Sequence, residues 1–154
     1  MQLLEFLSQS SLILWVAESN YGYPIVLTLH SIGMALVVGI MLVADLRVLG
    51  VASAIPFPMI KKFFTFAWIG LAINAGSGTL LFLANYSAFL SNTAFISKMV
   101  MLFAGAIATF FLTKSLDKVG SINGQAKSLA FFCLMLWLGA ITAGRIVGYT
   151  SVPM

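Results

Sequence analysis

Three ionisable side chains lie inside apolar stretches of this chain. They are His30, Lys98 and Arg145. A cation at the centre of a membrane-spanning helix costs about 2.5 kcal/mol or more, so an ionisable residue in such a place is a functional candidate by default. Each lies a few residues from the end of its apolar stretch, roughly 6 to 9 Å deep at ~1.5 Å per residue. The three positions therefore share a similar depth.

The charge around these residues points to an anionic ligand. No Asp or Glu lies in the same half of any apolar stretch to neutralise them. A cationic pocket without an acidic partner suits carboxylates, phosphates or a reduced quinone. A plainer interpretation is also open: Lys98 and Arg145 extend to lipid headgroups on their long stems, and His30 bonds a neighbouring backbone or hydroxyl group.

The helical face that carries His30 suggests one specific ligand. At ~100° per residue, four further residues lie within about 60° of His30 and form one stripe. They are Met34, Val37, Met41 and Asp45. A neutral imidazole among apolar side chains, near two cations, suits an axial ligand of the haem b iron, with the propionates directed at Lys98 and Arg145. Met34 adds a thioether; imidazole plus thioether is also a copper ligand set, and methionine stripes are common in plain packing.

The composition indicates what must position these residues. Of the 154 residues, 61% are hydrophobic and only 8% are charged, which cannot cover a water-soluble surface. The net charge of +4 comes from basic residues at the ends of apolar stretches, without a basic patch interleaved with aromatics, so nucleic acid is not an expected partner. The single cysteine, Cys133, provides neither a disulfide nor a thiolate metal site. We expect the lipid bilayer to be the partner of this chain.

Four apolar stretches have the ~20 residues needed to cross a bilayer. They cover about 24–46, 63–86, 94–113 and 128–149, and the third follows the N-cap cluster Ser91-Asn92-Thr93. Segment 1–18 is too interrupted by polar residues to span, and we expect it to form one or two short interfacial helices. The predicted fold is an all-α integral membrane four-helix bundle, a single transmembrane domain over 1–154.

Basic residues set the expected orientation. Six of the eight lie in or beside the loops after the first and third spans: Arg47, Lys61, Lys62, Lys114, Lys118 and Lys127. Such loops face the cytoplasm. Both termini, and with them the ends that hold His30, Lys98 and Arg145, are therefore expected on the periplasmic side of a bacterial inner membrane.

Several intramembrane residues have structural rather than chemical interpretations. Asn74 is expected to hydrogen-bond between helices. The small residues at 75–78, and Ala140, Gly144 and Gly148, fit close helix packing, or room for a flat ligand. Asp45 and Arg47 are expected to form a local ion pair that fixes the depth of the first span.

Several of these segments resemble known proteins. Residues 29–33, 45–50 and 95–98, with Trp137 and Gly144-Arg145, look like an uncharacterised family of small bacterial four-helix membrane proteins. More distantly, a first-span His and a later Lys are similar to the haem-binding protoporphyrinogen oxidase of the HemJ type and to the copper-resistance CopD type. That resemblance implies that His30 ligates haem b and that Lys98 is functionally important. With one histidine in the chain, ligation would be five-coordinate, His/Met, or shared between protomers.

The function expected from the sequence is therefore binding of haem b, in an electron-transfer or porphyrin-redox role, with His30 as the metal ligand. The alternatives are a non-catalytic accessory subunit of a larger membrane complex, and a membrane protein that binds quinone or another anionic small molecule. Expected partners are a quinone or redox partner, a second copy of the chain, or a larger complex.

Overall fold

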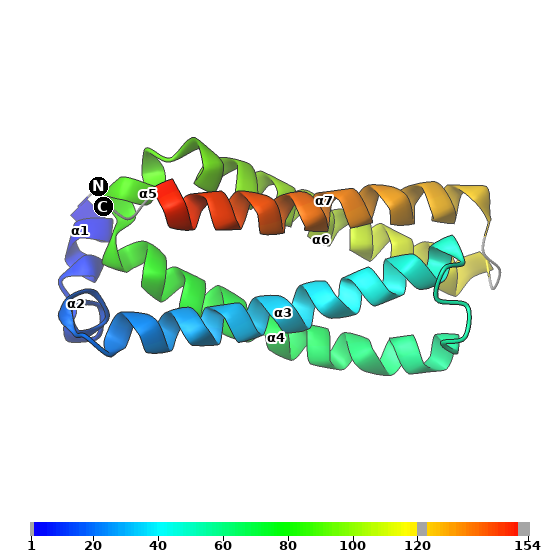
Figure 1. Ribbon diagram of the computed structural model, residues 1–154, viewed down its shortest axis with the longest axis horizontal. Coiled ribbons are helices and arrows are strands. Elements are labelled where there is room, and N and C mark those ends of the chain that lie inside the picture. The colour runs from blue at the N-terminus through cyan, green and yellow to red at the C-terminus, as the bar shows by residue number, and fades with distance from the viewer. Residues whose placement is uncertain (1, 120–122, 151–154) are drawn as a thin grey trace. The chain divides into compact units, whose positions relative to one another are not determined.

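The computed structural model describes residues 2–119 and 123–150, and it is all-α. Within these ranges 88% of the protein is helical and no strand occurs, so the predicted fold class is confirmed. The four long helices are α3 (Gly22–Leu49), α4 (Phe57–Ala84), α6 (Thr93–Val119) and α7 (Gly124–Thr150) (Figure 1). Three short helices complete the described part: α1 (Gln2–Ser8), α2 (Ser11–Glu18) and α5 (Tyr86–Leu90).

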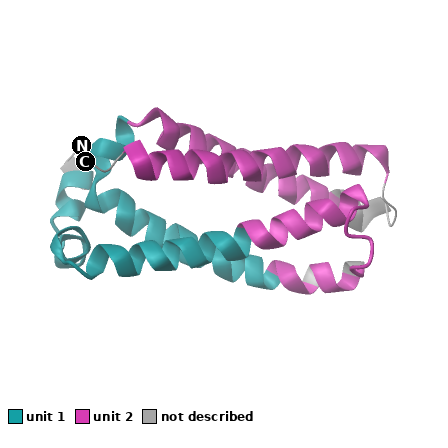
Figure 2. Cartoon of the chain, viewed as in Figure 1, with its two compact units in different colours: residues 1–37, 65–91 teal, residues 38–64, 92–154 magenta. Residues whose placement is uncertain are grey.

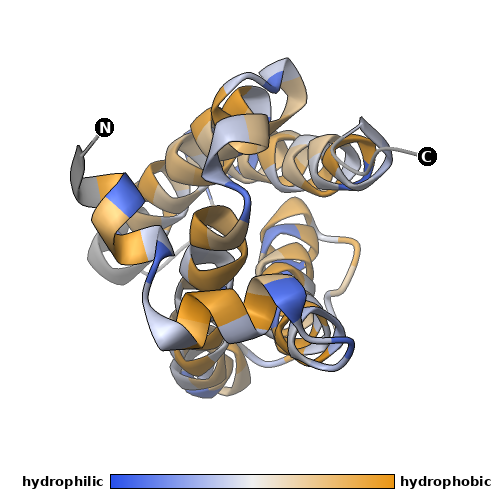
Figure 3. Ribbon diagram, turned by 90° about the vertical axis from the view of Figure 1, so that its left-hand side faces the viewer, coloured by the Kyte–Doolittle hydropathy of each residue, from blue (hydrophilic) through white to orange (hydrophobic). Residues whose placement is uncertain are grey.

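All four long helices contain a segment long and apolar enough to cross a membrane. These segments are Gly22–Leu49, Pro58–Ala84, Thr93–Lys114 and Gly124–Thr150. Hydrophobic residues lie around the helices rather than along one stripe (Figure 3), which is the pattern of helices surrounded by lipid. The chain is thus a multi-pass membrane protein.

The helices extend further than the apolar stretches predicted. α4 begins at Phe57, so Lys61 and Lys62 belong to its first turns rather than to a loop, and α6 continues past residue 113 to Val119. Hydropathy marks only the part of a helix that lies in hydrocarbon, whereas backbone hydrogen bonding continues into the polar region. The expected loop 87–93 also contains most of α5.

The end of α3 is fixed by Gly50, which has a φ of 93°. The Gly50 amide donates to the Arg47 carbonyl at 3.2 Å and the Val51 amide to the Leu46 carbonyl at 3.0 Å. These two bonds form a Schellman motif, in which a glycine adopts the left-handed conformation that other residues rarely take. The motif stops α3 directly after its polar residues Asp45 and Arg47.

The chain divides into two compact units, and the division runs through α3 and α4 (Figure 2). Unit 1 comprises residues 1–37 and 65–91, and unit 2 comprises residues 38–64 and 92–154. In unit 1, α2 packs on the long helices through Val16, which is fully buried against Val26 of α3 and Leu81 of α4. Residues 2–18 therefore contain two short helices, the second of which covers one end of the α3–α4 pair.

Two glycines bring α3 and α4 into backbone contact within unit 1. A Cβ on Gly33 would lie 2.7 Å from the amide nitrogen of Asn74 and 2.9 Å from the carbonyl oxygen of Gly70. A Cβ on Gly70 would lie 2.7 Å from the Cβ of Leu36. Small residues at such crossings let membrane helices gain van der Waals contact and interhelical hydrogen bonds, which replace the hydrophobic effect inside a bilayer.

In unit 2, α6 and α7 pack antiparallel along their lengths. The buried face of α7 consists mostly of small residues at helical spacing: Ala126, Ala130, Cys133, Trp137, Ala140, Ala143 and Val147. Trp137 is the large exception; its ring lies on Gly105, and its Nε1 donates to Thr109 Oγ1 at 3.3 Å. At the start of α6, Asn92 Oδ1 caps the helix by accepting the Ala94 amide at 2.9 Å, as the N-cap cluster predicted.

The backbone contact in unit 1 predicts opposite effects for two alanine substitutions in α4. Gly70→Ala would force the helices apart, and overpacking of this kind costs about 1–3 kcal/mol. Gly76 has no atom within 4 Å of the position its Cβ would take. Gly76→Ala should therefore be neutral or stabilising by up to about 1 kcal/mol through helix propensity. Thermal unfolding in detergent, followed by circular dichroism, compares the two variants; equal melting temperatures would contradict the proposed contact.

Candidate functional site

His30 is held against α4 by a reciprocal pair of hydrogen bonds with Asn74. Its Nδ1 lies 3.1 Å from the Asn74 carbonyl oxygen, and the Asn74 side-chain amide donates to the His30 carbonyl oxygen at 3.0 Å. The hydroxyl of Ser77 lies 3.2 Å from the same Nδ1. Asn74 and Ser77 are buried, whereas the imidazole is half-buried. The expectation that Asn74 bonds between helices is confirmed.

These contacts assign the tautomer of the imidazole. The Ser77 hydroxyl donates to the Ile73 carbonyl at 2.6 Å, so its oxygen is an acceptor toward the ring. The Asn74 amide nitrogen is also near Nδ1, but at 3.4 Å it is farther away than the Asn74 carbonyl oxygen at 3.1 Å, which can only accept. The closest contact of Nδ1 is thus an acceptor, which favours the tautomer with the proton on Nδ1. In the neutral ring the lone pair then lies on Nε2, which is the usual arrangement of a metal-ligating histidine.

Gly78 makes room for this ring. A Cβ on Gly78 would lie 3.0 Å from His30 Cε1 and 3.3 Å from Nδ1, closer than side chains normally pack. Gly76, on the other side of the helix, faces open space. The small residues at 75–78 thus do not act as one flat patch: Gly78 accommodates the imidazole, Ser77 bonds it, and Gly76 does neither.

An apolar cluster lies one helical turn from His30 in unit 1. Val26 precedes His30 by four residues on α3, and it packs with Val16 of α2 and Leu81 of α4. All three are at most 7% exposed. This cluster packs α2 against α3 and α4, one helical turn from His30.

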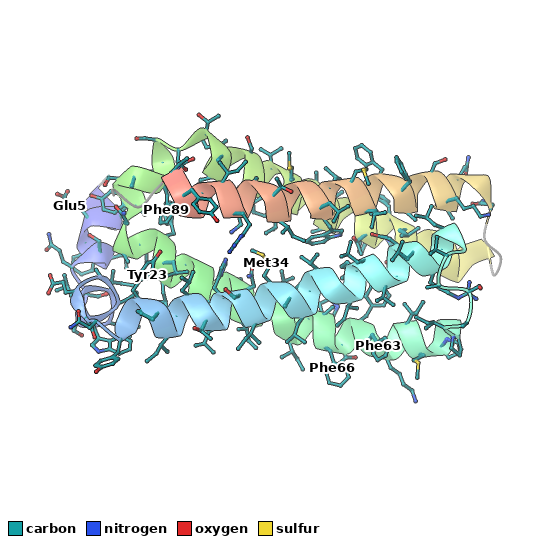
Figure 4. All side chains as sticks on the ribbon, in the orientation of Figure 1. Glu5, Tyr23, Met34, Phe63, Phe66 and Phe89 are labelled. Carbon is teal, nitrogen blue, oxygen red and sulfur yellow. The ribbon has the colours of Figure 1, made fainter. Side chains whose placement is uncertain are left out.

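Met34 follows His30 by one turn and lies on the same face of α3, as its spacing predicted. Its side chain is half-buried. In Figure 4 it leaves the α3–α4 pair on the side opposite to Phe66, which points outward and is 55% exposed. Unit 1 therefore holds an imidazole and a thioether on one helical face.

Lys98 and Arg145 both belong to unit 2, on α6 and α7. The Lys98 side chain lies along Gly144: its Cδ and Cε are 3.5 Å and its Nζ 3.7 Å from where a Gly144 Cβ would be. Lys98 is half-buried, whereas Arg145, the next residue of α7, is exposed. Of the three small residues expected to pack on α7, Ala140 is buried, Gly144 receives Lys98, and Gly148 faces open space.

Asp45 does not form the local ion pair that the sequence suggested with Arg47, whose Nε donates to the Ile55 carbonyl oxygen instead. Residues two apart on a helix point to different sides, so the local pair is geometrically disfavoured. The Asp45 side chain is 1% exposed, and its Oδ2 has no hydrogen-bond partner among the described residues. The sequence signal for this site was present, because Asp45 lies on the stripe that begins at His30.

Within the ranges that the structure describes, no group of three or more His, Cys, Asp or Glu side chains is arranged to hold a metal ion. Comparison of the chain with protein-family models, curated protein sequences and solved structures found no match.

Proposed function

We propose that this protein binds haem b in the membrane, in an electron-transfer or porphyrin-redox role, with His30 Nε2 as an axial ligand of the iron. The observation that carries the proposal is the contact between His30 Nδ1 and the Asn74 carbonyl oxygen at 3.1 Å. A carbonyl acceptor on one ring nitrogen orients the imidazole and raises the basicity of the other nitrogen, as in most metal-ligating histidines.

The residues present fit a porphyrin better than a bare metal ion. A bare ion needs several protein ligands, and the described residues offer no such group. The porphyrin itself supplies the equatorial nitrogens, so only axial ligands are required from the protein. His30 supplies one. The second position stays open, is filled by Met34, or is filled by a residue of a second copy of the chain.

Lys98 and Arg145 are the proposed partners of the haem propionates. Lys98 lies five residues after α6 begins at Thr93, and Arg145 five residues before α7 ends at Thr150. Because successive membrane spans alternate in direction, we expect both at a depth similar to that of His30, which lies eight residues after α3 begins at Gly22. Cationic side chains paired with carboxylates form the stronger, charge-assisted class of hydrogen bond.

The proposed orientation places this level in the periplasmic half of a bacterial inner membrane, with both termini on the periplasmic side. Six of the eight Lys and Arg residues lie toward the opposite ends of the spans. Positive residues are retained on the cytoplasmic side. A haem at this depth would exchange electrons with a quinone or with a protein on the outer surface.

The chain's own residues would tune such a haem in two ways. Bound haem supplies one-electron redox chemistry, with a potential set by its axial ligands and its surroundings. The Asn74 and Ser77 oxygens hold the His30 ring in one orientation, and Gly78 leaves space for it. The Val16–Val26–Leu81 cluster keeps water from one side of this level.

An optical spectrum tests the proposal. Protein purified with haem available should give a Soret band and, in the reduced-minus-oxidised difference, an α-band. His30→Ala should lose these bands, because the axial ligand is gone. Ser31→Ala is the matched control: Ser31 is exposed and bonds only the Leu27 carbonyl of its own helix, so its haem content should equal that of the wild type.

A wild-type spectrum without these bands would overturn the proposal. Purification without chromophore but together with a larger membrane complex would instead support the accessory-subunit alternative, and a co-purifying quinone would support the quinone-site alternative. Bands that persist in His30→Ala would leave haem binding in place and remove His30 as its ligand.

The fit of the imidazole on Gly78 gives a second prediction. Gly78→Ala would place a methyl group 3.0 Å from His30 Cε1, so the ring must move and haem affinity should fall. Gly76→Ala changes the same helix by the same group without touching the ring. Haem titration of the two apoproteins compares them, and equal affinities would show that the ring position does not matter.

The cations give a third prediction. Lys98→Gln and Arg145→Gln should each weaken haem binding while leaving the axial ligation spectrum unchanged. A hydrogen bond to a charged group contributes about 1.5–3 kcal/mol, which corresponds to roughly tenfold or more in affinity. Lys127→Gln, a cation at the far end of α7, is the control. Unchanged affinity in both variants would exclude the propionate role.

A further inference from the structure

Asp45 is a deeply buried acidic side chain that lies outside the proposed haem site. It lies in the last turns of α3, where only 1% of its surface is exposed. Among the described residues no group donates a hydrogen bond to its Oδ2. Burying an ionised carboxylate without a partner costs several kcal/mol, so the charge has to be neutralised by something in the folded protein.

A small cavity of about 20 Å³ adjoins this carboxyl within unit 2. Its lining comes from three helices and comprises Ala44, Asp45, Val48, Ile60, Phe64, Thr109, Leu112 and Thr113. A cavity needs about 10–15 Å³ to hold one water molecule, so this one has room for a single water-sized species. The buried Asp45 Oδ2, which has no hydrogen-bond partner among the described residues, thus belongs to a residue that lines a cavity large enough for one water molecule.

The lining decides the chemical class of the occupant. Of its polar side chains, Asp45 alone is ionisable, so an anion is excluded by charge. A hard metal cation such as Mg²⁺ or Ca²⁺ would need six or more oxygen ligands. The lining supplies one carboxyl and two hydroxyls, and Thr113 already donates to the Phe110 carbonyl at 2.9 Å while Thr109 accepts from Trp137. A proton needs only the carboxyl oxygen and a water molecule to carry it.

The surroundings contain few other groups that would titrate with Asp45. Every other lining residue from α3, α4 and α6 is apolar or a threonine. From α7, the buried Cys133 thiol lies within electrostatic range. Arg47 on α3 is engaged with the Ile55 carbonyl, and Lys114 of α6 lies over the Phe110 ring at 4.7 Å. Within the described ranges, the titratable or charged groups near Asp45 are thus one thiol and two cations.

We propose that Asp45 is a proton-binding site that carries a proton in the folded protein and exchanges it through one water molecule in this cavity. The step is a simple transfer. A hydronium ion at the Arg47 end of α3 gives its proton to Asp45 Oδ2, which leaves water and a neutral carboxylic acid. In the reverse step a water molecule accepts the proton and the carboxylate remains. The site does not depend on the proposed haem.

Infrared spectroscopy of the full-length protein tests this proposal directly. The chain has only four acidic residues, and two of them, Glu5 and Glu18, are exposed, so a protonated carboxyl is readily assigned. Near neutral pH the wild type should show the C=O stretch of one protonated carboxyl, which shifts promptly in D₂O. Asp45→Asn, which keeps the shape of the side chain, should lose that band.

A cavity-filling variant separates proton binding from water access. Ala44→Val adds two methyl groups to the cavity lining and leaves the carboxyl in place. It should keep the band but slow its shift in D₂O. A melting temperature close to that of the wild type verifies that either variant is folded.

Four results would overturn the proposal. They are the absence of the band in the wild type, its survival in Asp45→Asn, a D₂O shift that is no faster in the wild type than in Ala44→Val, and a band that appears only when NaCl is replaced by choline chloride. The last result would identify an alkali cation as the occupant.

Discussion

Polar groups inside a bilayer must find hydrogen-bond partners within the protein. In unit 1, the partners of His30 require α3 and α4 to pack closely. Its Nδ1 and carbonyl oxygen both bond to Asn74, one turn of α3 against one turn of α4. This exchange is possible only where the backbones approach closely, which the glycines at 33 and 70 allow. Individual bonds of this kind average about 0.6 kcal/mol in membranes, so their main effect is to orient the ring.

The polar residues of unit 2 lie in surroundings that differ from those of His30 in unit 1. Lys98 extends along Gly144 on a helix pair whose contact is built from small residues, and Trp137 is satisfied by a single hydroxyl. Asp45 has no hydrogen-bonding group of the described chain at its Oδ2, but it has a cavity. An oriented imidazole and a carboxyl whose Oδ2 has no described partner lie on one helix, and we propose a different ligand for each: a porphyrin for the first and a proton for the second.

The sequence predicted the elements better than the contacts. Apolar length alone identifies four membrane helices, and the cost of burying charge identifies His30, Lys98 and Arg145 as residues to examine. The apolar stretch at 63–86 predicted the start of α4 six residues too late, because a helix continues beyond the apolar part of its sequence. The short helix α5 was missed for a different reason: five residues carry almost no periodic signal.

The contacts themselves depend on which faces meet, and this is not encoded in any single segment. Gly70, Gly76 and Gly78 look alike in the sequence, yet one touches α3, one touches open space and one receives an imidazole. Likewise, Asp45 and Arg47 are neighbours in the sequence but point to different sides of α3. The sequence therefore indicates which residues could have a role, whereas the structure is needed to show which side chain or helix each of them contacts.

The most direct test of this account is the tautomer of its only histidine. Nitrogen NMR of protein labelled with ¹⁵N-histidine gives the signals of one imidazole, because the chain contains no other. The account predicts a protonated Nδ1 and an unprotonated Nε2 in the haem-free protein, with the Nε2 signal changed when haem is added. A protonated Nε2, or an Nε2 signal unaffected by haem, would contradict it.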